Sequence, residues 1–218
     1  IKPDGIDINF GCPVPKVAKQ NAGATLFKDI KLSREIIAAT IDATDLPVSI
    51  KTRTRAGDVE LIEFLDYMKD LDIKALMVHG RTLKQGFSGD IDCEVIKKAR
   101  DYFGGIIMTN GGIVDRETAE KALTESGADG LGIARAAFGK PWIFKELKDD
   151  NFKPLEKEEI FKVIIRHAEL VLKHKGEKKL VEMRKHLCWY TQGFSGAKAL
   201  REKLLQVDTV DDIKNILK

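Results

Sequence analysis

The sequence predicts an α/β fold: a TIM-type (β/α)8 barrel, here incomplete with about five βα units, followed by a small C-terminal helical bundle. Three observations carry this prediction. Short apolar runs alternate with helical patterns through the first 150 residues, polar residues gather where those runs end, and every pattern from residue 155 onward is helical. Repeated βα units indicate a parallel sheet with right-handed crossovers.

The first prediction concerns the strands. Apolar runs expected to form them cover residues 5–10, 47–50, 75–78, 105–108 and 130–133. In a barrel the active site is built at the carboxyl ends of the strands, so the residues that follow each run are the candidates for function. These are Gly11-Cys12-Pro13, Lys51-Thr52-Arg53, His79-Gly80-Arg81, Asn110-Gly111-Gly112 and Ala134-Arg135.

Helical patterns fill the intervals between the strands. Ser33 is expected to cap the first helix and Asp58 to open the second. The third is marked by apolar residues between 95 and 103, and the fourth is expected to run from an Asp115 cap to Gly127. A glycine after the last periodic residue is typical of a helix end.

The strand count leaves two topologies open. A complete barrel has eight strands and about 250 residues, whereas five strands are visible in these 218 residues. Either three strands precede Ile1, or the sheet is open and doubly wound; we favour the missing strands. The chain starts Ile-Lys-Pro-Asp, without an initiator Met or a leader, and is therefore expected to belong to a longer chain.

The predicted domains are residues 1–150, the partial barrel, and residues 151–218, the helical domain. Apolar stripes in the second part predict one helix ending at Gly176, a second ending at Gly193, a third capped by Ser195 and a fourth around Val210. This part holds 15 Lys and Arg against 10 Asp and Glu, whereas the first part holds 22 against 24. A basic tail favours a polyanionic partner, although a solvated helical surface has the same composition.

Composition excludes several classes of protein. Hydrophobic residues make up 43% and charged residues 33%, which is typical of globular proteins. No run of 18 apolar residues is present, so no membrane span is expected. The three cysteines, Cys12, Cys93 and Cys188, are far apart and form no CxxC pair, so we expect neither disulfides nor a metal site, and a cytoplasmic location.

Cys12 and Lys51 are the first candidates for chemistry. Cys12 follows a strand inside a Gly-Cys-Pro turn, which places it at the barrel mouth, where a thiol can act as nucleophile, ligand or proton donor. Cys93 and Cys188 are expected to be small buried hydrophobes. Lys51, flanked by apolar Ile50, is expected to point inward and bind an electron-rich group. Arg53 is expected on the solvent-facing rim.

The loops after the last two strands suggest a phosphate site. Asn110-Gly111-Gly112 offers bare glycine amides, and Arg135 adds a positive charge. Barrels commonly bind phosphate at these two loops. His79 and Arg81 flank a glycine at the preceding strand end. A phosphate grip, an inward lysine and a cysteine at the mouth together indicate an enzyme that uses flavin mononucleotide (FMN).

Ten segments in a fixed order now carry a family resemblance. They are Asn9-Phe10-Gly11-Cys12-Pro13, Gly23-Ala24, Lys51-Thr52-Arg53, His79-Gly80-Arg81-Thr82, Gln85-Gly86-Phe87-Ser88-Gly89, Asn110-Gly111-Gly112-Ile113, Arg135-Ala136-Ala137, Pro141-Trp142-Ile143-Phe144, Met183-Arg184-Lys185-His186 and Gly193-Phe194-Ser195-Gly196. Across nearly the whole chain they resemble the tRNA-dihydrouridine synthases, most closely the bacterial B-type branch, without the N-terminal part.

The resemblance implies FMN-dependent reduction of specific uridines in tRNA to 5,6-dihydrouridine, with NADPH as electron donor. Cys12 would donate a proton to C5 of uracil. Substrate-binding residues would be Asn9, Arg81, Arg184 and Lys185, the last two on the helical tRNA-binding domain. Cofactor-binding residues would be Lys51, His79, Asn110, Gly111, Gly112, Ala134 and Arg135.

Some positions depart from the family pattern. Gly112 stands where Asp is common, Ala134 where Gly usually precedes the arginine, and Cys93 where Trp is frequent. The first three strands, with flavin contacts of their own, are absent. Two other functions remain open: a related FMN barrel acting on a small-molecule pyrimidine, which would lack the basic helical domain, and an inactive fragment that only binds RNA.

Overall fold

The computed structural model describes residues 2–218 and divides into two compact units, the first ending at Ala134 and the second covering Arg135–Lys218. Each unit is described by itself. None of the helices within residues 2–218 has both the length and the apolar character needed to cross a membrane.

A five-stranded parallel sheet forms the centre of the first unit. Its strands are β1 (Ile6–Asn9), β2 (Val48–Arg53), β5 (Ala75–His79), β6 (Ile106–Asn110) and β7 (Gly130–Gly132), and they lie side by side in chain order. All neighbouring pairs are parallel. The five predicted strands are therefore confirmed, with boundaries shifted by a few residues.

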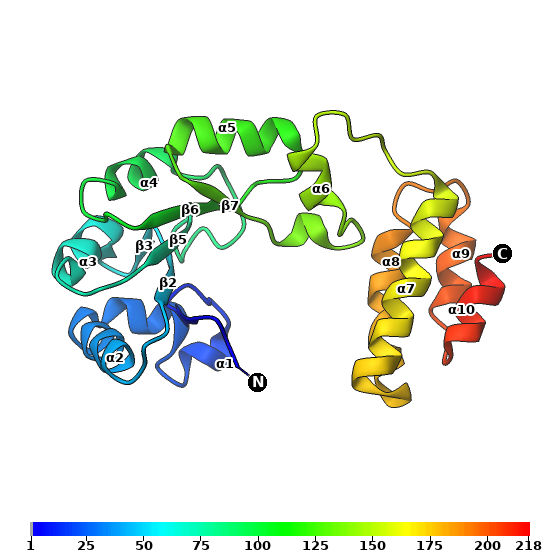
Figure 1. Ribbon diagram of the computed structural model, residues 1–218, viewed down its shortest axis with the longest axis horizontal. Helices are drawn as coiled ribbons and strands as arrows, with labels where there is room; N and C mark the ends of the chain where they lie inside the picture. Colours follow the sequence, from blue (N-terminus) through cyan, green and yellow to red (C-terminus); the bar gives the residue numbers. More distant parts are fainter. Residues whose placement is uncertain (1) are drawn as a thin grey trace. The chain divides into compact units, whose positions relative to one another are not determined.

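Helices cover one face of this sheet (Figure 1). Ile50, Leu76 and Ile107 point to that face and are buried among apolar residues of the helices. Met77 and Met108 alternate with them, point to the opposite face and are only half-buried. The helices are α2 (Ile30–Asp42), α3 (Leu61–Met68), α4 (Cys93–Ala99) and α5 (Arg116–Ser126).

Strand order and helix cover decide between the two topologies. A doubly wound sheet reverses its strand order at a switch point and carries helices on both faces. Here the order runs without reversal and helices cover one face, as in part of a barrel wall. The structure is therefore consistent with an incomplete α/β barrel and does not support the doubly wound alternative.

Two predicted helix starts were wrong. Asp29 caps α2 by accepting from the Leu32 amide, whereas Ser33 lies inside the helix and its buried hydroxyl donates to the Leu26 carbonyl. Asp58 opens no helix, because it lies in the turn of a small hairpin, and α3 begins at Leu61. The hairpin strands are β3 (Arg55–Ala56) and β4 (Val59–Glu60), and two short elements precede α2: α1 (Pro15–Ala18) and η1 (Gly23–Lys28).

The second unit is helical throughout and has its own apolar core. Leu180, Leu187 and Ile213 are buried there, as the predicted stripes require. The predicted Ser195 cap of the third helix in this part was wrong, because Gly196 occupies the N-cap position of α9. The elements are η2 (Arg135–Ala137), α6 (Ile143–Lys148), α7 (Lys157–Lys175), η3 (Glu177–Glu182), α8 (Met183–Tyr190), α9 (Ala197–Leu204) and α10 (Val210–Ile216).

The boundary between the compact units lies earlier than the predicted one after residue 150. Residues 135–150 group with the helical unit, where Phe138 and Trp142 pack. Phe138 stacks on Trp189 with ring centroids 4.4 Å apart, and Trp142 lies 6.3 Å from Tyr190 in a similar arrangement. Ring stacking across this segment explains why it stays with the helices.

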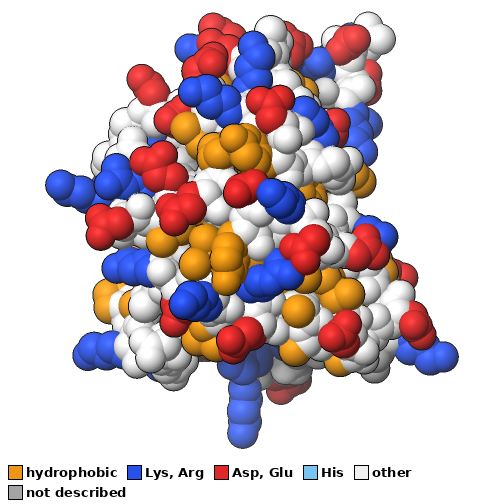
Figure 2. Space-filling view, turned by 90° about the vertical axis from the view of Figure 1, so that its left-hand side faces the viewer, with side chains coloured by type: hydrophobic (Ala, Val, Ile, Leu, Met, Phe, Trp, Pro, Cys, Tyr) orange, Lys and Arg blue, Asp and Glu red, His pale blue; other side chains and the backbone are white. Residues whose placement is uncertain are grey.

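Charges of both signs are interspersed with small apolar patches on the face shown in Figure 2. Neither sign forms a continuous field on that face.

Candidate active site

The carboxyl edge of the sheet brings four of the predicted residues together. Strand pairing sets Asn9 beside Lys51, and His79 beside Asn110. Lys51 and Asn110 also lie on the same face as Met77, the face that the helices leave uncovered. The result is an apolar floor of two thioethers, Met77 and Met108, bordered by polar side chains.

Lys51 and Asn110 form a hydrogen-bonded chain across this face. The Lys51 Nζ donates to the Asn110 Oδ1 at 3.3 Å, and the Asn110 Nδ2 donates to the Gly132 carbonyl at 2.6 Å. Burial lowers the pKa of Lys51 from 10.5, the cation of Arg53 lowers it further, and Asp7 opposes the shift. The ammonium is thus partly desolvated and held by an amide, as predicted for an inward lysine.

Cys12 lies in a turn whose backbone is held by three hydrogen bonds to Asn9 and Ala24. The Asn9 Oδ1 accepts from the amides of Gly11 and Cys12, at 2.9 and 3.0 Å. The Cys12 carbonyl accepts from the Ala24 amide at 3.0 Å. Gly23 has a φ of 62°, and a Cβ there would lie 2.8 Å from that carbonyl. Glycine at position 23 is therefore required for the close approach of this segment to the cysteine turn.

His79 and Arg81 are buried side by side. They are 6% and 7% exposed, and the Arg81 Nη1 lies 3.4 Å from the His79 Nε2. The Arg81 Nε donates to the Gly89 carbonyl at 2.8 Å. Gly111 has a φ of 115°, and a Cβ there would lie 2.7 Å from the His79 ring. Glycine at position 111 therefore allows the loop after β6 to pack against this imidazole.

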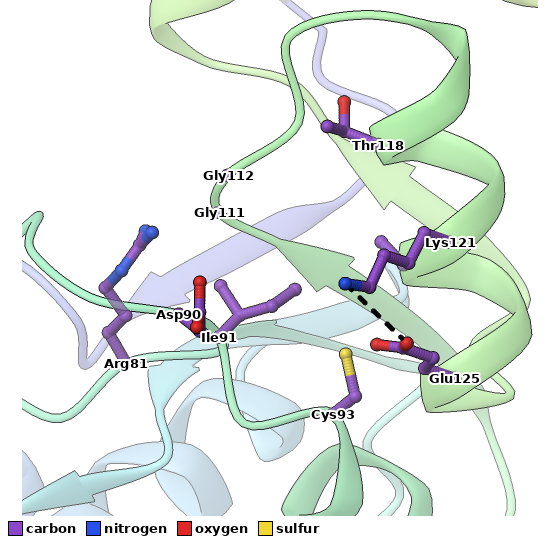
Figure 3. Close-up of a pocket in the computed structure, with 10 residues that line it drawn as sticks. Arg81, Asp90, Ile91, Cys93, Gly111, Gly112, Thr118, Lys121 and Glu125 are labelled. Carbon is purple, nitrogen blue, oxygen red and sulfur yellow. Dashed lines mark ion pairs between the residues drawn. The ribbon is translucent and has the colours of Figure 1, made fainter.

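A pocket of about 150 Å³ opens beside this loop. Figure 3 shows Arg81 and Ile91 on one side and residues of α5 on the other. The Cys93 sulfur faces the pocket near the Lys121–Glu125 ion pair. Burial, the charge of Glu125 and a hydrogen bond to it raise the pKa of Cys93. Its low exposure of 8% agrees with the predicted structural role, whereas Cys188 is only half-buried.

Four further predicted residues lie at or beyond the end of the first unit. Ala134 is its last residue, Arg135 is the first residue of the second unit, and both are exposed. In α8, Arg184 donates to the Val207 carbonyl at 3.1 Å and pairs with Asp208 at 2.7 Å. Its neighbour Lys185 is exposed, as the helical periodicity predicted.

Arg53 is the residue whose placement the sequence interpretation missed. It was expected on the solvent-facing rim, but it is only 2% exposed. Because β2 continues to residue 53, Arg53 points to the same face as Lys51. The spacing of two residues between the basic side chains was the available signal.

Comparison with known proteins gives the family. A model for "Dihydrouridine synthase (Dus)" matches residues 1–218. The chain belongs to the dihydrouridine synthase family. It is 34% identical to "Probable tRNA-dihydrouridine synthase 1" of Synechocystis sp. over 220 residues, which is 97% of this chain and 62% of that protein. It is 36% identical to "Probable tRNA-dihydrouridine synthase" of Mycobacterium tuberculosis over 227 residues, or 98% of this chain and 58% of the relative.

A B-type relative is also similar to this dihydrouridine synthase family member. "tRNA-dihydrouridine synthase B" of Serratia marcescens is 36% identical over 195 residues, covering 86% of this chain and 58% of its own length. The chain thus spans about three fifths of the curated relatives that it matches. The resemblance stated from the motifs is confirmed at the level of the family.

Proposed function

We propose that this chain carries the proton donor and much of the flavin site of an FMN- and NADPH-dependent tRNA-dihydrouridine synthase. The reaction is the reduction of uridine in tRNA to 5,6-dihydrouridine. The observation that carries the proposal is the convergence, in a member of this family, of the Cys12 turn and the Lys51–Asn110 pair on one edge of the sheet. We also propose a cytoplasmic location.

The uncovered sheet face fits the isoalloxazine ring of FMN. Met77 and Met108 form a half-buried apolar floor for a planar ring, and Lys51 lies beside them as a donor for its polar edge. Gly111 and Gly112 have φ values of 115° and 70°, a conformation that favours glycine. Because glycine has no side chain, this turn presents bare backbone. We assign Lys51, His79 and Asn110 to the ring, and Gly111, Gly112, Ala134 and Arg135 to the phosphate.

FMN, when bound, supplies the hydride that is added to C6 of uracil, with NADPH as the source of electrons. The chain's own contribution is the proton that C5 receives, which we assign to the Cys12 thiol. General acid catalysis requires the donor to be held within hydrogen-bond reach of the reacting atom. The hydrogen bonds of the Cys12 turn to Asn9 and Ala24 hold the backbone from which the thiol projects.

A uridine within folded tRNA must leave its stack to reach this edge of the sheet. We assign Asn9 and Arg81 to the extruded base. Lys185 is exposed and suited to a phosphate contact, whereas the guanidinium of Arg184 is shared with Asp208. We propose that the helical unit binds the tRNA backbone through Lys185 and its other exposed cations, with Arg184 orienting this surface.

The test incubates the protein with tRNA that lacks dihydrouridine. Cys12→Ala is expected to retain flavin and to slow single-turnover reduction by about 10²–10⁴-fold. Cys188→Ala is the matched control, because Cys188 is also half-buried but lies in the other unit. Reduction is measured by mass spectrometry of digested tRNA. An unchanged rate in Cys12→Ala would remove the thiol from the mechanism, and a protein without releasable flavin would refute the cofactor assignment.

A further inference from the structure

Arg53 ends β2 as a buried cation. It is the largest side chain among the fully buried residues of the described chain, at 2% exposure. Burial lowers the pKa of Arg53, as does Arg81, while Cys12 raises it. A guanidinium taken out of water is costly unless its N–H groups find acceptors. The position of those acceptors therefore shows what the residue holds in place.

All three acceptors are backbone carbonyls from two different loops. The Arg53 Nε donates to the Gly11 carbonyl at 2.8 Å. Its Nη1 donates to the carbonyls of Thr82 and Gly86, at 3.1 and 3.3 Å. Gly11 belongs to the loop after β1, and the other two belong to the loop after β5. Because β2 lies between β1 and β5, one planar group ties the loops of both neighbouring strands.

Each of these loops carries one of the residues proposed for the substrate. Gly11 immediately precedes Cys12. Thr82 immediately follows Arg81, whose guanidinium is anchored to Gly89 in the same loop. The Thr82 amide is in turn held by the side chain of Gln85 at 2.8 Å. Arg53 therefore connects the turn of the thiol to the loop of Arg81 through a rigid fork.

The geometry points to Arg53 as a positioning residue for the proposed proton donor. It fixes the carbonyl before Cys12 relative to the loop that holds Arg81, so that thiol and guanidinium meet the uracil at a set spacing. This inference rests on the proposed function. A lysine would retain the charge but presents one compact ammonium in place of a planar fork. It cannot satisfy three carbonyls from two loops in the same way.

The test compares Arg53→Lys and Arg53→Met with Arg100→Met. Arg100 is the matched control because it donates to the Gly105 carbonyl at 2.7 Å and to Asp129 at 2.6 Å. Those partners directly precede β6 and β7, so they lie at the amino ends of the strands, whereas the Arg53 contacts lie at the carboxyl ends. All three variants remove arginine bonds from the first unit, but only the Arg53 variants release the two loops.

The first measurement is amide hydrogen exchange of this chain, read in peptides covering residues 6–18 and 80–90. Both Arg53 variants are expected to speed exchange in both peptides by about tenfold or more, since each loop loses a bond to a charged donor. Arg100→Met should leave these peptides unchanged. If exchange changes in neither loop, or equally across the whole unit, Arg53 does not tie the loops and the inference is overturned.

The second measurement separates positioning from stability in the tRNA-reducing protein. Arg53→Lys is expected to lower kcat about tenfold, while the KM for tRNA and the flavin content change less than about twofold. A normal kcat together with loosened loops overturns the inference. If Cys12→Ala also leaves the rate unchanged, the assignment of the thiol fails instead, and the exchange result still establishes the link between the loops.

Discussion

Replacing Asn110 by Ala removes the central link of the chain that joins Lys51 to Gly132. The Gly132 carbonyl loses its 2.6 Å bond, and the half-buried ammonium loses its 3.3 Å bond. A neutral hydrogen bond contributes about 0.5–1.5 kcal/mol and a bond to a charged group about 1.5–3 kcal/mol. Because the second bond is long and only partly shielded from water, we expect a loss of about 2–3 kcal/mol in the free energy of unfolding.

The measurement is urea unfolding followed by circular dichroism and by tryptophan fluorescence. Both tryptophans, Trp142 and Trp189, lie in the second unit, so fluorescence monitors that unit alone. Asn110→Ala should shift the midpoint seen by circular dichroism more than the midpoint seen by fluorescence. Asn215→Ala, at an exposed position, should change the free energy by less than about 0.5 kcal/mol.

A double-mutant cycle with Lys51→Met isolates the charged bond. With the ammonium absent, Asn110→Ala should cost about 1 kcal/mol less than in the parent. Lys51→Met also tests the lowered pKa of Lys51. The unfolded chain binds more protons between the lowered pKa and 10.5, so the cost of burying this lysine is relieved as the pH rises through that interval. A cycle with no coupling would refute the proposed contact.

Three further outcomes are expected. Thr109→Val should raise the free energy of unfolding by about 1 kcal/mol in thermal melts, because the buried hydroxyl has no hydrogen-bond partner among residues 2–218; a loss would reveal a partner. Burial, His186 and Lys175 lower the pKa of His167 from 6.5. The unfolded state therefore binds more protons between the lowered pKa and 6.5, and the free energy of unfolding falls as the pH drops through that interval. His167→Gln should flatten this fall in urea unfolding followed by fluorescence. Cys93 should react with iodoacetamide at least about tenfold more slowly than Cys188 at pH 8, since its thiol is buried and its pKa is raised. The rates are measured by peptide mass spectrometry, and equal rates would contradict the burial of Cys93.

Local sequence patterns determined the elements whose signals are short-range. Apolar runs predicted all five strands because parallel strands must be apolar where helices cover them, as at Ile50, Leu76 and Ile107. Asp115 and Gly127 predicted both ends of α5, since a capping side chain and a left-handed glycine act within one turn of the helix. The positions of Cys12, Lys51 and Asn110 at strand ends followed from the same pattern.

Only the tertiary structure decided which side chains satisfy distant partners. Ser33 is a good cap in isolation, yet Asp29 caps the helix because the Ser33 hydroxyl is used by the Leu26 carbonyl in a buried contact. Arg53 is charged and would favour solvent, yet it is buried because carbonyls of residues 29 to 42 positions away accept hydrogen bonds from its guanidinium. The spacing from Lys51 indicates the face to which Arg53 points but not its acceptors, because a guanidinium can leave water only where the fold gathers several acceptors around it.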